Sequence, residues 1–543
     1  MQKLGEMQDW PLRVMRLVDH AEREHADGEI VSAWADGTIT RTNWRNVAHD
    51  ARRMAQALEA LGIKPGDRVA TLAMNHSHHL TSWYGAIGMG GVLHTINPRL
   101  FDEQLEYIAN HAEDRVLLYD HVWAPVVERM KPKWTTIEKY ICFDPPVGWT
   151  GDTTFVDWLA PHDGNYQWFE GDERDPCGLC YTSGTTGNPK GVLYEHRSTM
   201  IHTLVEASPD VFNLSTHAVV VPIVPMFHAN AWGLPWAAPM VGCKLVLSAD
   251  YRPEQMCRLF HDERVTHSAG VPTIWLGMIE YIERTGEDLG DLKYVTIGGS
   301  AAPRAMIRWF RDRGIQVGHA WGMTETSPIG SMGAPPRGWD GMSDAQQMDY
   351  IARQGRVPFG VEVRTVDDDG NLLPRDGKSS GQLQVRGPWV IKRYFKAEVD
   401  ATADGQWFDT GDVAAMHPDG TIQITDRSKD VIKSGGEWIS SIDLENAAVG
   451  CPGVAEAAAI GIPHPKWDER PLLVCVKVEG SDVCAVKTRE HLTANVAKWW
   501  LPDAIEFVEE LPHTATGKLS KKTLRDQFRD YRFADAADMV GRD

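Results

Sequence analysis

Apolar residues recur at helical spacing near the start of the chain. A helix is predicted to begin after Asn43, which can cap it, and to end at Gly62. Its apolar face carries Val47, Ala51, Met54, Leu58 and Leu61. Uniformly apolar runs at 68–74 and 92–96 predict strands buried on both faces, with another helix at about 80–89 between them. Strand, helix and strand at this spacing favour βαβ units in a parallel sheet.

The middle of the chain repeats this pattern, and the region after Val361 departs from it. Strands at 244–248 and 294–297, together with a helix at 253–261, again predict α/β structure. After Val361, apolar and polar residues alternate, which indicates half-buried strands. Strands are expected there at 361–366, 381–386 and 421–425, with a hairpin turn at 367–370. This change predicts a smaller β-rich unit.

The pattern changes again after Asp426. A helix is expected at 442–449, a strand at 473–478 and a basic amphipathic segment at 518–532. We therefore expect a boundary near 426–431. The predicted fold class is α/β, with a large N-terminal domain of parallel or mixed sheets and helices, a β-rich subdomain, and a small α+β domain at the C-terminus.

Composition narrows the class of protein. Of 543 residues, 43% are hydrophobic and 24% are charged, which is ordinary for a globular protein and excludes a largely disordered chain. The formal net charge is −20, from 55 Lys and Arg against 75 Asp and Glu. This balance argues against nucleic acid as a partner, because phosphate binding needs a positive surface. A local basic pocket for an anionic ligand is still compatible with it.

No segment predicts a membrane span or a secretion signal. The first residues lack an apolar stretch, and the longest apolar region, 222–248, is interrupted by prolines and by His228. We expect a cytoplasmic protein without an integral membrane segment. The eight cysteines do not suggest a disulfide framework. Cys177 and Cys180 are interpreted as small buried residues of a strand, with a redox role left open.

The most informative segment is a glycine loop at 181–191, which reads YTSGTTGNPKG. Its small residues let backbone N–H groups turn inward onto an anion. Its hydroxyl side chains add donors, and Lys190 adds a positive charge. The loop therefore predicts a polyphosphate site. It is not a Walker A loop, because Pro189 breaks the required spacing, and this disfavours a P-loop kinase or GTPase.

This loop resembles the signature of the adenylate-forming acyl-CoA synthetases, a superfamily that includes luciferases and the adenylation domains of peptide synthetases. Six further segments resemble the family's other motifs, in the family's order. They are Gly298–Pro303, Trp321–Glu325, Trp407–Asp412, Asp426–Asp430, Ser434–Trp438 and Pro512–Lys518. A single match of this kind would be weak, but the ordered set spans almost the whole chain and is specific.

The resemblance implies a reaction in two steps. A carboxylate attacks the α-phosphorus of ATP, which gives an acyl-adenylate and pyrophosphate; the thiol of coenzyme A then attacks the acyl carbon and expels AMP. ATP, Mg²⁺ and coenzyme A are the implied cofactors. The implied domains are an N-terminal adenylation and acyl-binding domain at 1–426, with its β-rich subdomain at about 355–426, a hinge at 427–431 around Lys429, and a mobile C-terminal domain at 432–543.

The first step brings one anion against another, so it needs positive charge at the reacting groups. By resemblance, Lys518 bridges the reacting carboxylate and the phosphate, and Lys190 belongs to the catalytic set. Thr182 and Glu325 are the implied Mg²⁺ ligands, which suits a hard cation held by one carboxylate, a hydroxyl and water. Taken alone, Lys518 would be a surface lysine and Glu325 a solvated carboxylate.

The implied nucleotide contacts follow the same motifs. Asp412 accepts hydrogen bonds from the ribose hydroxyls and Arg427 donates to the same sugar; the alternative is a plain salt bridge between them. Trp321 stands where the family usually has Tyr and keeps an aromatic face for adenine, and His319 reads the adenine edge. Further implied contacts are Thr182, Ser183, Gly184, Thr185, Thr186, Gly187 and Lys190 in the loop, Gly299, Ser300 and Ala301 at adenine, and Gly322 and Thr324. Coenzyme A is implied to contact Lys433, Gly435, Gly436 and Trp438.

The segment 225–233 resembles the family's acyl pocket. By resemblance, His228 borders the reacting carboxyl group and Trp232 gates the acyl tunnel; the alternative is that both are core residues. The implied substrate contacts are His228, Trp232, Gly299 and Met323. Segments 94–100 and 433–444 look most like medium- and long-chain fatty acyl-CoA synthetases, a branch shared with methylmercaptopropionate-CoA ligases. The expected acid is a medium- to long-chain fatty acid, with a short thioether acid or an arylalkanoic acid as the alternative.

Four alternative functions differ from the acyl-CoA ligase in features that the sequence or the reaction products would reveal. A peptide-synthetase module would need a carrier domain, which is not expected after Lys518, and nothing in the sequence singles out a luciferase-type oxygenase. A nucleotide sensor would keep the nucleotide contacts but could lose Lys518 or Glu325, and both are present. An ATP-dependent phosphotransferase would release ADP. A homodimer formed through the N-terminal domain is implied by the relatives only.

Overall fold

The computed structural model describes residues 6–182, 188–403, 405–434, 437–513 and 519–533. A central sheet is ordered β15-β14-β13-β12-β10-β11-β1-β2, and its inner strands pair in parallel. The edge strands β15 and β2 run antiparallel to their neighbours. The strands are β1 (Glu29–Ala33), β2 (Ile39–Asn43), β10 (Val219–Pro222), β11 (Lys244–Ser248), β12 (His267–Gly270), β13 (Tyr294–Ile297), β14 (Gln316–Gly322) and β15 (Ile329–Met332).

An N-terminal sheet is ordered β7-β6-β5-β3-β4-β8-β9 and is parallel except at the last pair. Its strands are β3 (Arg68–Leu72), β4 (Val92–Thr95), β5 (Asp114–Asp120), β6 (Lys139–Phe143), β7 (Thr153–Thr154), β8 (Pro176–Tyr181) and β9 (Gly191–Glu195). The parallel βαβ arrangement predicted from the apolar runs is confirmed.

Helices connect and cover these two sheets. The first are α1 (Met15–Glu24), α2 (Trp44–Ala60), α3 (Ser77–Gly88), α4 (Asp102–Ala112), η1 (His121–Trp123), α5 (Ala124–Met130), α6 (Phe155–Leu159) and α7 (His196–Glu206). The next are η2 (Ala229–Gly233), α8 (Leu234–Val241), α9 (Pro253–Asp262), α10 (Pro272–Thr285), α11 (Arg304–Asp312), η3 (Thr324–Thr326), η4 (Trp339–Gly341) and α12 (Asp344–Ile351). The expected cap is confirmed, because the Asn43 side chain accepts a hydrogen bond from the backbone N–H of Asn46 at the start of α2.

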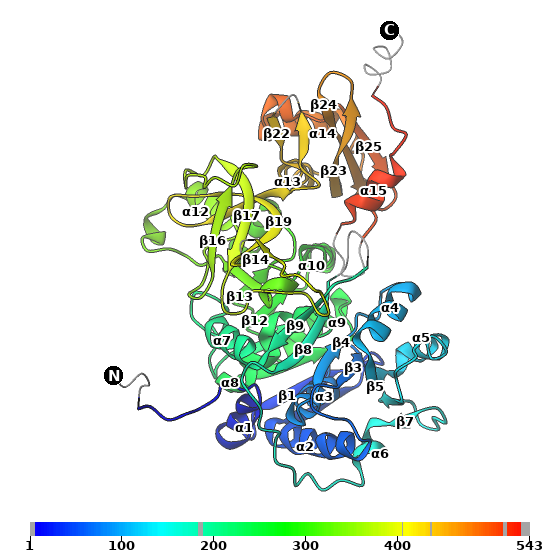
Figure 1. Ribbon diagram of the computed structural model, residues 1–543. Helices are drawn as coiled ribbons and strands as arrows, with labels where there is room; N and C mark the ends of the chain where they lie inside the picture. Colours follow the sequence, from blue (N-terminus) through cyan, green and yellow to red (C-terminus); the bar gives the residue numbers. More distant parts are fainter. Residues whose placement is uncertain (1–5, 183–187, 404, 435–436, 514–518, 534–543) are drawn as a thin grey trace.

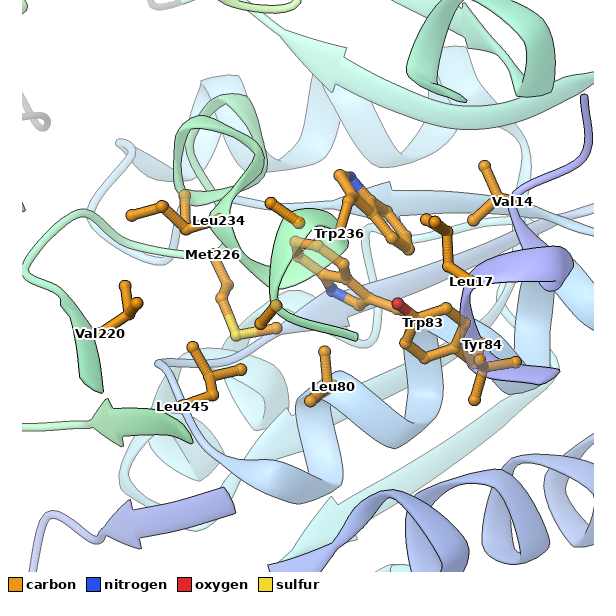
Figure 2. Close-up of a cluster of buried hydrophobic side chains, with 14 of the residues drawn as sticks. Val14, Leu17, Leu80, Trp83, Tyr84, Val220, Met226, Leu234, Trp236 and Leu245 are labelled. Carbon is orange, nitrogen blue, oxygen red and sulfur yellow. The ribbon is translucent and has the colours of Figure 1, made fainter. Parts of the chain in front are cut away.

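The largest apolar core joins the two sheets through α1, α3 and α8 (Figure 2). Trp83 of α3 and Trp236 of α8 lie with their ring centroids 4.8 Å apart, and Tyr84 meets Trp236 edge-on at 5.4 Å. Aromatic pairs of this kind stabilise a core beyond the area that they bury. The core fixes the position of the segment just before α8, which contains the expected acyl pocket.

A β-rich sheet follows, ordered β16-β17-β19-β18 with β20 paired to β19. Its strands are β16 (Glu362–Val366), β17 (Ser380–Arg386), β18 (Thr402–Ala403), β19 (Trp407–Met416) and β20 (Ile422–Arg427). The expected turn at 367–370 is present, because the Gly370 backbone N–H donates to the Asp367 carbonyl at 3.0 Å. Directly after the turn the chain forms a single β-bridge, between Val366 and Leu372. The strand that pairs with β16 along its length is β17. Pro374 lacks the N–H that a continuing ladder needs.

The C-terminal sheet is ordered β22-β21-β24-β23, with β25 paired to β24, and lies at the far end of the molecule beyond the β-rich sheet (Figure 1). Its strands are β21 (Ile432–Ser434), β22 (Glu437–Ile439), β23 (Val454–His464), β24 (Asp468–Lys477) and β25 (Ala504–Val508). The helices are α13 (Ser441–Val449), α14 (Ala485–Asn495), η5 (Lys498–Trp500) and α15 (Lys521–Gln527). The predicted α/β fold class, with its β-rich and C-terminal parts, is confirmed. The proposed boundaries of the domains stay predictions.

Cys177 and Cys180 lie on β8 and are buried, as expected. Burial raises the pKa of the Cys177 thiol to about 12 and that of the Cys180 thiol to about 11. Residues three apart on a strand face opposite sides, so these two thiols do not face each other. Among the described residues, no helix is long and apolar enough to cross a membrane.

Candidate active site

The glycine loop connects the antiparallel strands β8 and β9. Thr182 and Lys190 stand at its two ends: the Thr182 backbone N–H donates to the Lys190 carbonyl at 2.9 Å, and the Lys190 backbone N–H donates to the Thr182 hydroxyl at 3.2 Å. These bonds close the base of the loop and bring the Thr182 side chain beside the exposed Lys190. Ser183, Gly184, Thr185, Thr186 and Gly187 lie outside the described residues.

Glu325 lies on η3, directly after β14, and only 7% of the residue is exposed. The Tyr394 hydroxyl donates to its Oε1 atom at 2.8 Å, and the Ile391 backbone N–H donates to its carbonyl at 2.8 Å. Burial raises the pKa of the Glu325 carboxyl group, while the Tyr394 hydrogen bond and the nearby Lys190 and Arg427 charges act in the opposite direction. Glu325 is therefore a buried carboxylate that is fixed by hydrogen bonds, and it is not a solvated side chain.

Gly322 leads from β14 into this turn. A Cβ atom at this position would lie 1.8 Å from the carbonyl oxygen of Pro328. Backbone atoms cannot move aside as a side chain can, so the close approach requires glycine. The geometry thus explains a glycine beside Glu325 without any role in ligand contact.

We expect Gly322→Ala to lower the free energy of unfolding by about 1–3 kcal/mol, because the added methyl group forces two backbone segments apart. Urea unfolding followed by far-ultraviolet circular dichroism measures this. Gly277→Ala is the control: it lies in α10 with nothing within 4 Å of the added Cβ, and it should not destabilise the protein. A Gly322→Ala variant as stable as the unmodified protein contradicts the close approach.

Asp412 joins two of the expected nucleotide residues. The Trp321 indole N–H donates to its Oδ2 atom at 2.8 Å, and the Arg427 Nε atom lies 3.5 Å from its Oδ1 atom. Asp412 on β19 and Arg427 on β20 are also strand partners. The Asp412–Arg427 contact is long, and 45% of the Arg427 side chain is exposed, so an isolated surface salt bridge would contribute little stability here.

His319 is also buried, and both of its ring nitrogens are engaged by the protein. Nδ1 donates to the Ala352 carbonyl at 3.1 Å, and Nε2 accepts the Ala302 backbone N–H at 3.2 Å. Burial lowers the pKa of His319 to about 4, so the ring is neutral and holds this tautomer at neutral pH. The ring therefore supports the segment 298–303 and leaves neither nitrogen free to read adenine in this arrangement.

The expected acyl-pocket segment forms an unusual turn, because Ala229, Asn230, Ala231, Trp232 and Gly233 all have positive φ. The Trp232 indole reaches the expected adenine loop: a Cβ atom on Gly298 would lie 3.2 Å from its Cη2 atom. His228 stands just before the turn, and its carbonyl accepts the Ala231 backbone N–H at 3.1 Å. The segment thus places the Trp232 indole against the expected adenine loop.

The remaining expected residues divide between the two sides of the site. Gly299, Ser300 and Ala301 follow β13, Met323 lies between β14 and η3, and Thr324 is the first residue of η3. Lys429 lies between β20 and β21, and Lys433 is exposed on β21. Lys518, Gly435 and Gly436 lie outside the described residues, as does the side chain of Trp438. All of these assignments stay predictions.

The structure adds one residue that the sequence did not indicate. Tyr394 contacts both Glu325 and Lys190, with the Lys190 Nζ atom 4.9 Å from its ring centroid. It lies in a polar run, KRYFK at 392–396, that carries no motif of its own. Its importance comes from a contact across 69 positions of the chain, which no local pattern reveals.

Comparison with known proteins shows the family of the chain. Residues 18–395 match the family model described as AMP-binding enzyme, and residues 443–518 match the AMP-binding enzyme C-terminal domain. The chain is 48% identical to the 3-methylmercaptopropionyl-CoA ligase of Ruegeria lacuscaerulensis, over 97% of this chain and 99% of that protein. It is 44% identical to the medium-chain-fatty-acid–CoA ligase of Ectopseudomonas oleovorans, over 97% and 98%. The anthranilate CoA ligase AuaEII in complex with anthranoyl-AMP shares the fold, with a TM-score of 0.86 at 24% identity over 96% of this chain and 99% of that one.

Proposed function

The chain belongs to the AMP-binding enzyme family and is an AMP-forming acyl-CoA ligase, and from this premise we propose that its substrate is a short apolar carboxylic acid. The observation that carries the proposal is the position of Trp232 against Gly298. The relatives named for 3-methylmercaptopropionate and for medium-chain fatty acids make a short thioether acid the first candidate and a medium-chain acid the second.

We assign Trp232 to the end of the acyl site, because its indole packs against Gly298. Thr296 on β13 and Gly318 on β14 are strand partners, so they face the same side of the central sheet. Both border a cavity of about 20 Å³, whose lining also includes Phe212 and Leu234. In this proposal a short acyl chain ends at the Trp232 indole, and a longer chain fits only if the indole moves.

The ligase uses ATP, Mg²⁺ and coenzyme A. The oxygen donors at the site suit Mg²⁺: the buried Glu325 carboxylate and the Thr182 hydroxyl are hard ligands, and phosphate and water complete such a shell. When bound, Mg²⁺ supplies positive charge to the phosphate oxygens.

Side chains of the protein are assigned to the nucleotide and to the acid. Asp412 is assigned to the ribose hydroxyls, and the Trp321 indole N–H holds one of its oxygens. Lys190, at the mouth of the glycine loop, provides positive charge for the phosphates. Lys518 is assigned to the reacting carboxylate and His228 to the acyl side on resemblance. Because two anions must meet in the first step, these cations lower the barrier by neutralising charge as it concentrates.

A substrate series tests the proposal. We expect kcat/KM to be greatest for 3-methylmercaptopropionate and hexanoate and to level off or fall for octanoate, decanoate and palmitate. An unobstructed apolar tunnel would instead raise kcat/KM about fourfold with each added CH₂, which is the equivalent of about 0.8 kcal/mol. AMP and pyrophosphate release is followed with ATP and Mg²⁺, with and without coenzyme A.

Trp232→Ala is the informative variant, because it removes the obstruction and should shift the optimum toward longer acids. A steady rise of kcat/KM through palmitate in the unmodified protein contradicts the short-acid proposal. Release of ADP in place of AMP contradicts the ligase reaction itself.

A further inference from the structure

The segment 387–396, between β17 and β18, fastens two parts of the active site to each other. Its Ile391 backbone N–H donates to the carbonyl of Glu325 at 2.8 Å. Its Phe395 backbone N–H donates to the carbonyl of Gly191, at the end of the glycine loop, also at 2.8 Å. The segment therefore spans from the expected Mg²⁺ ligand to the base of the phosphate loop.

Tyr394 lies between these two anchor points and contacts a charged side chain on each side. Its hydroxyl donates to Glu325 Oε1 at 2.8 Å, and the Lys190 Nζ atom lies 4.9 Å from its ring centroid. The backbone bonds of Ile391 and Phe395 on either side fix where the ring can lie. The half-buried aromatic ring is thus a rigid spacer between a carboxylate and an ammonium group.

We propose that Tyr394 is a positioning residue that keeps the Glu325 carboxylate directed at Mg²⁺ and the Lys190 ammonium directed at phosphate. The inference rests on the proposed roles of Glu325 and Lys190. Both charged groups contact the same ring, and opposite charges attract, so a Glu325–Lys190 ion pair would withdraw both groups from the ligand. The Tyr394 hydroxyl occupies one carboxylate oxygen, which leaves Oε2 for a cation, and the ring face gives the ammonium group an alternative to the carboxylate.

The two halves of Tyr394 can be tested separately. Tyr394→Phe removes only the hydroxyl, so it releases Glu325 and keeps the ring under Lys190. Tyr394→Leu removes the ring as well. Phenylalanine keeps the packing of the ring, so we expect this variant to fold, and far-ultraviolet circular dichroism checks it.

The measurement is ATP binding by isothermal titration calorimetry without acid or coenzyme A, over a series of Mg²⁺ concentrations, so that no turnover contributes. We expect Tyr394→Phe to raise the Mg²⁺ concentration for half-maximal enhancement of ATP binding about tenfold, the size expected when a hydrogen bond to a charged group is lost. We expect Tyr394→Leu to add a loss of about threefold in ATP affinity in the absence of Mg²⁺, from the lost ring contact with Lys190.

Tyr119→Phe is the matched control. The Tyr119 hydroxyl donates to the carboxylate of Asp152 at 2.7 Å, in the N-terminal sheet and away from Glu325. Removing it should leave the Mg²⁺ dependence of ATP binding unchanged. The same hydroxyl-to-carboxylate bond is lost in both variants, so a difference between them belongs to the site.

Glu325→Gln separates this inference from the proposed function. If Glu325→Gln and Tyr394→Phe shift the Mg²⁺ dependence and the double variant adds nothing further, the positioning role is supported. If Glu325→Gln shifts it and Tyr394→Phe does not, the role of Tyr394 is overturned and the assignment of Glu325 stands. If Glu325→Gln leaves the Mg²⁺ dependence unchanged, both are overturned.

Discussion

Replacing Asp412 by Ala is expected to weaken ATP binding about 100-fold, because two hydrogen bonds from ribose to a charged acceptor are lost. Asp412 is 7% exposed, so few water molecules can replace those bonds. Its Oδ2 atom accepts the Trp321 indole N–H at 2.8 Å, which fixes the carboxylate before the nucleotide arrives. Calorimetric titration with ATP and Mg²⁺ measures the loss directly.

Asp409→Ala is the matched control for Asp412→Ala. Asp409 lies on the same strand, is exposed, and uses its carboxylate to accept the Gly411 backbone N–H at 3.0 Å. The Asp409→Ala substitution removes the same charge a few residues away. It should leave ATP affinity within about twofold of that of the unmodified protein, as expected for a screened surface charge. ATP affinity that is equal in the Asp409→Ala and Asp412→Ala variants would remove Asp412 from the ribose site.

Asp412→Ala also leaves the buried Trp321 N–H without its acceptor, which costs stability of about 1–3 kcal/mol. A double variant separates this effect from the loss of nucleotide contacts. Trp321→Phe in the Asp412→Ala background removes the unsatisfied donor, so stability should partly return while ATP affinity stays low. Recovery of ATP affinity together with stability would mean that Asp412 acts through folding alone.

The sequence predicted most of the regular structure because local patterns determine it. The Asn43 cap and the apolar face of the following helix place α2 correctly, since capping and helical periodicity act within a few residues. The length of the connection after the turn at 367–370 was less predictable. An Asp-Asp-Asp-Gly run marks a turn reliably, but it does not say which strand returns, and here β16 pairs with β17 after a longer connection.

The active site was predictable as a set of motifs and not as a set of contacts. Trp321 and Asp412 are 91 positions apart, yet they share a hydrogen bond. His319 was expected at adenine because of its place in the motif, but the fold engages both of its ring nitrogens with backbone groups. Tyr394 carried no signal, because its role depends on where Glu325 and Lys190 come to lie. Sequence motifs identified the chemistry, and tertiary contacts decide which atoms remain available for it.

The second large effect is expected at the hinge. Lys429 lies in the turn after β20, where the Asp430 and Val431 backbone N–H groups both donate to the Arg427 carbonyl, at 2.8 and 2.9 Å. The contacts around it join its two sides: Asp426 accepts the Ser441 backbone N–H at 2.7 Å. The resemblance implies that the C-terminal part rotates about this turn between the two half-reactions, so the backbone of Lys429 must adopt two conformations.

We expect Lys429→Pro to slow thioester formation about 100-fold while leaving acyl-adenylate formation within about threefold. Proline fixes φ near −65°, and a conformation disfavoured by roughly 2.7 kcal/mol is populated about 100-fold less. Single-turnover experiments measure the two steps separately: pyrophosphate release with ATP and acid reports the first, and acyl-CoA formation from the preformed adenylate reports the second.

Lys429→Ala is the control, because it removes the same side chain and leaves the backbone free. Both half-reactions should then stay close to those of the unmodified protein, which assigns the effect of proline to the backbone and not to the lost ammonium group. Equal losses in both half-reactions of Lys429→Pro would contradict a hinge, since a rigid turn that serves one conformation only must favour one step over the other. A defect shared by the alanine variant would instead place the Lys429 side chain in the reaction, and the rotation would have to be sought elsewhere between β20 and β21.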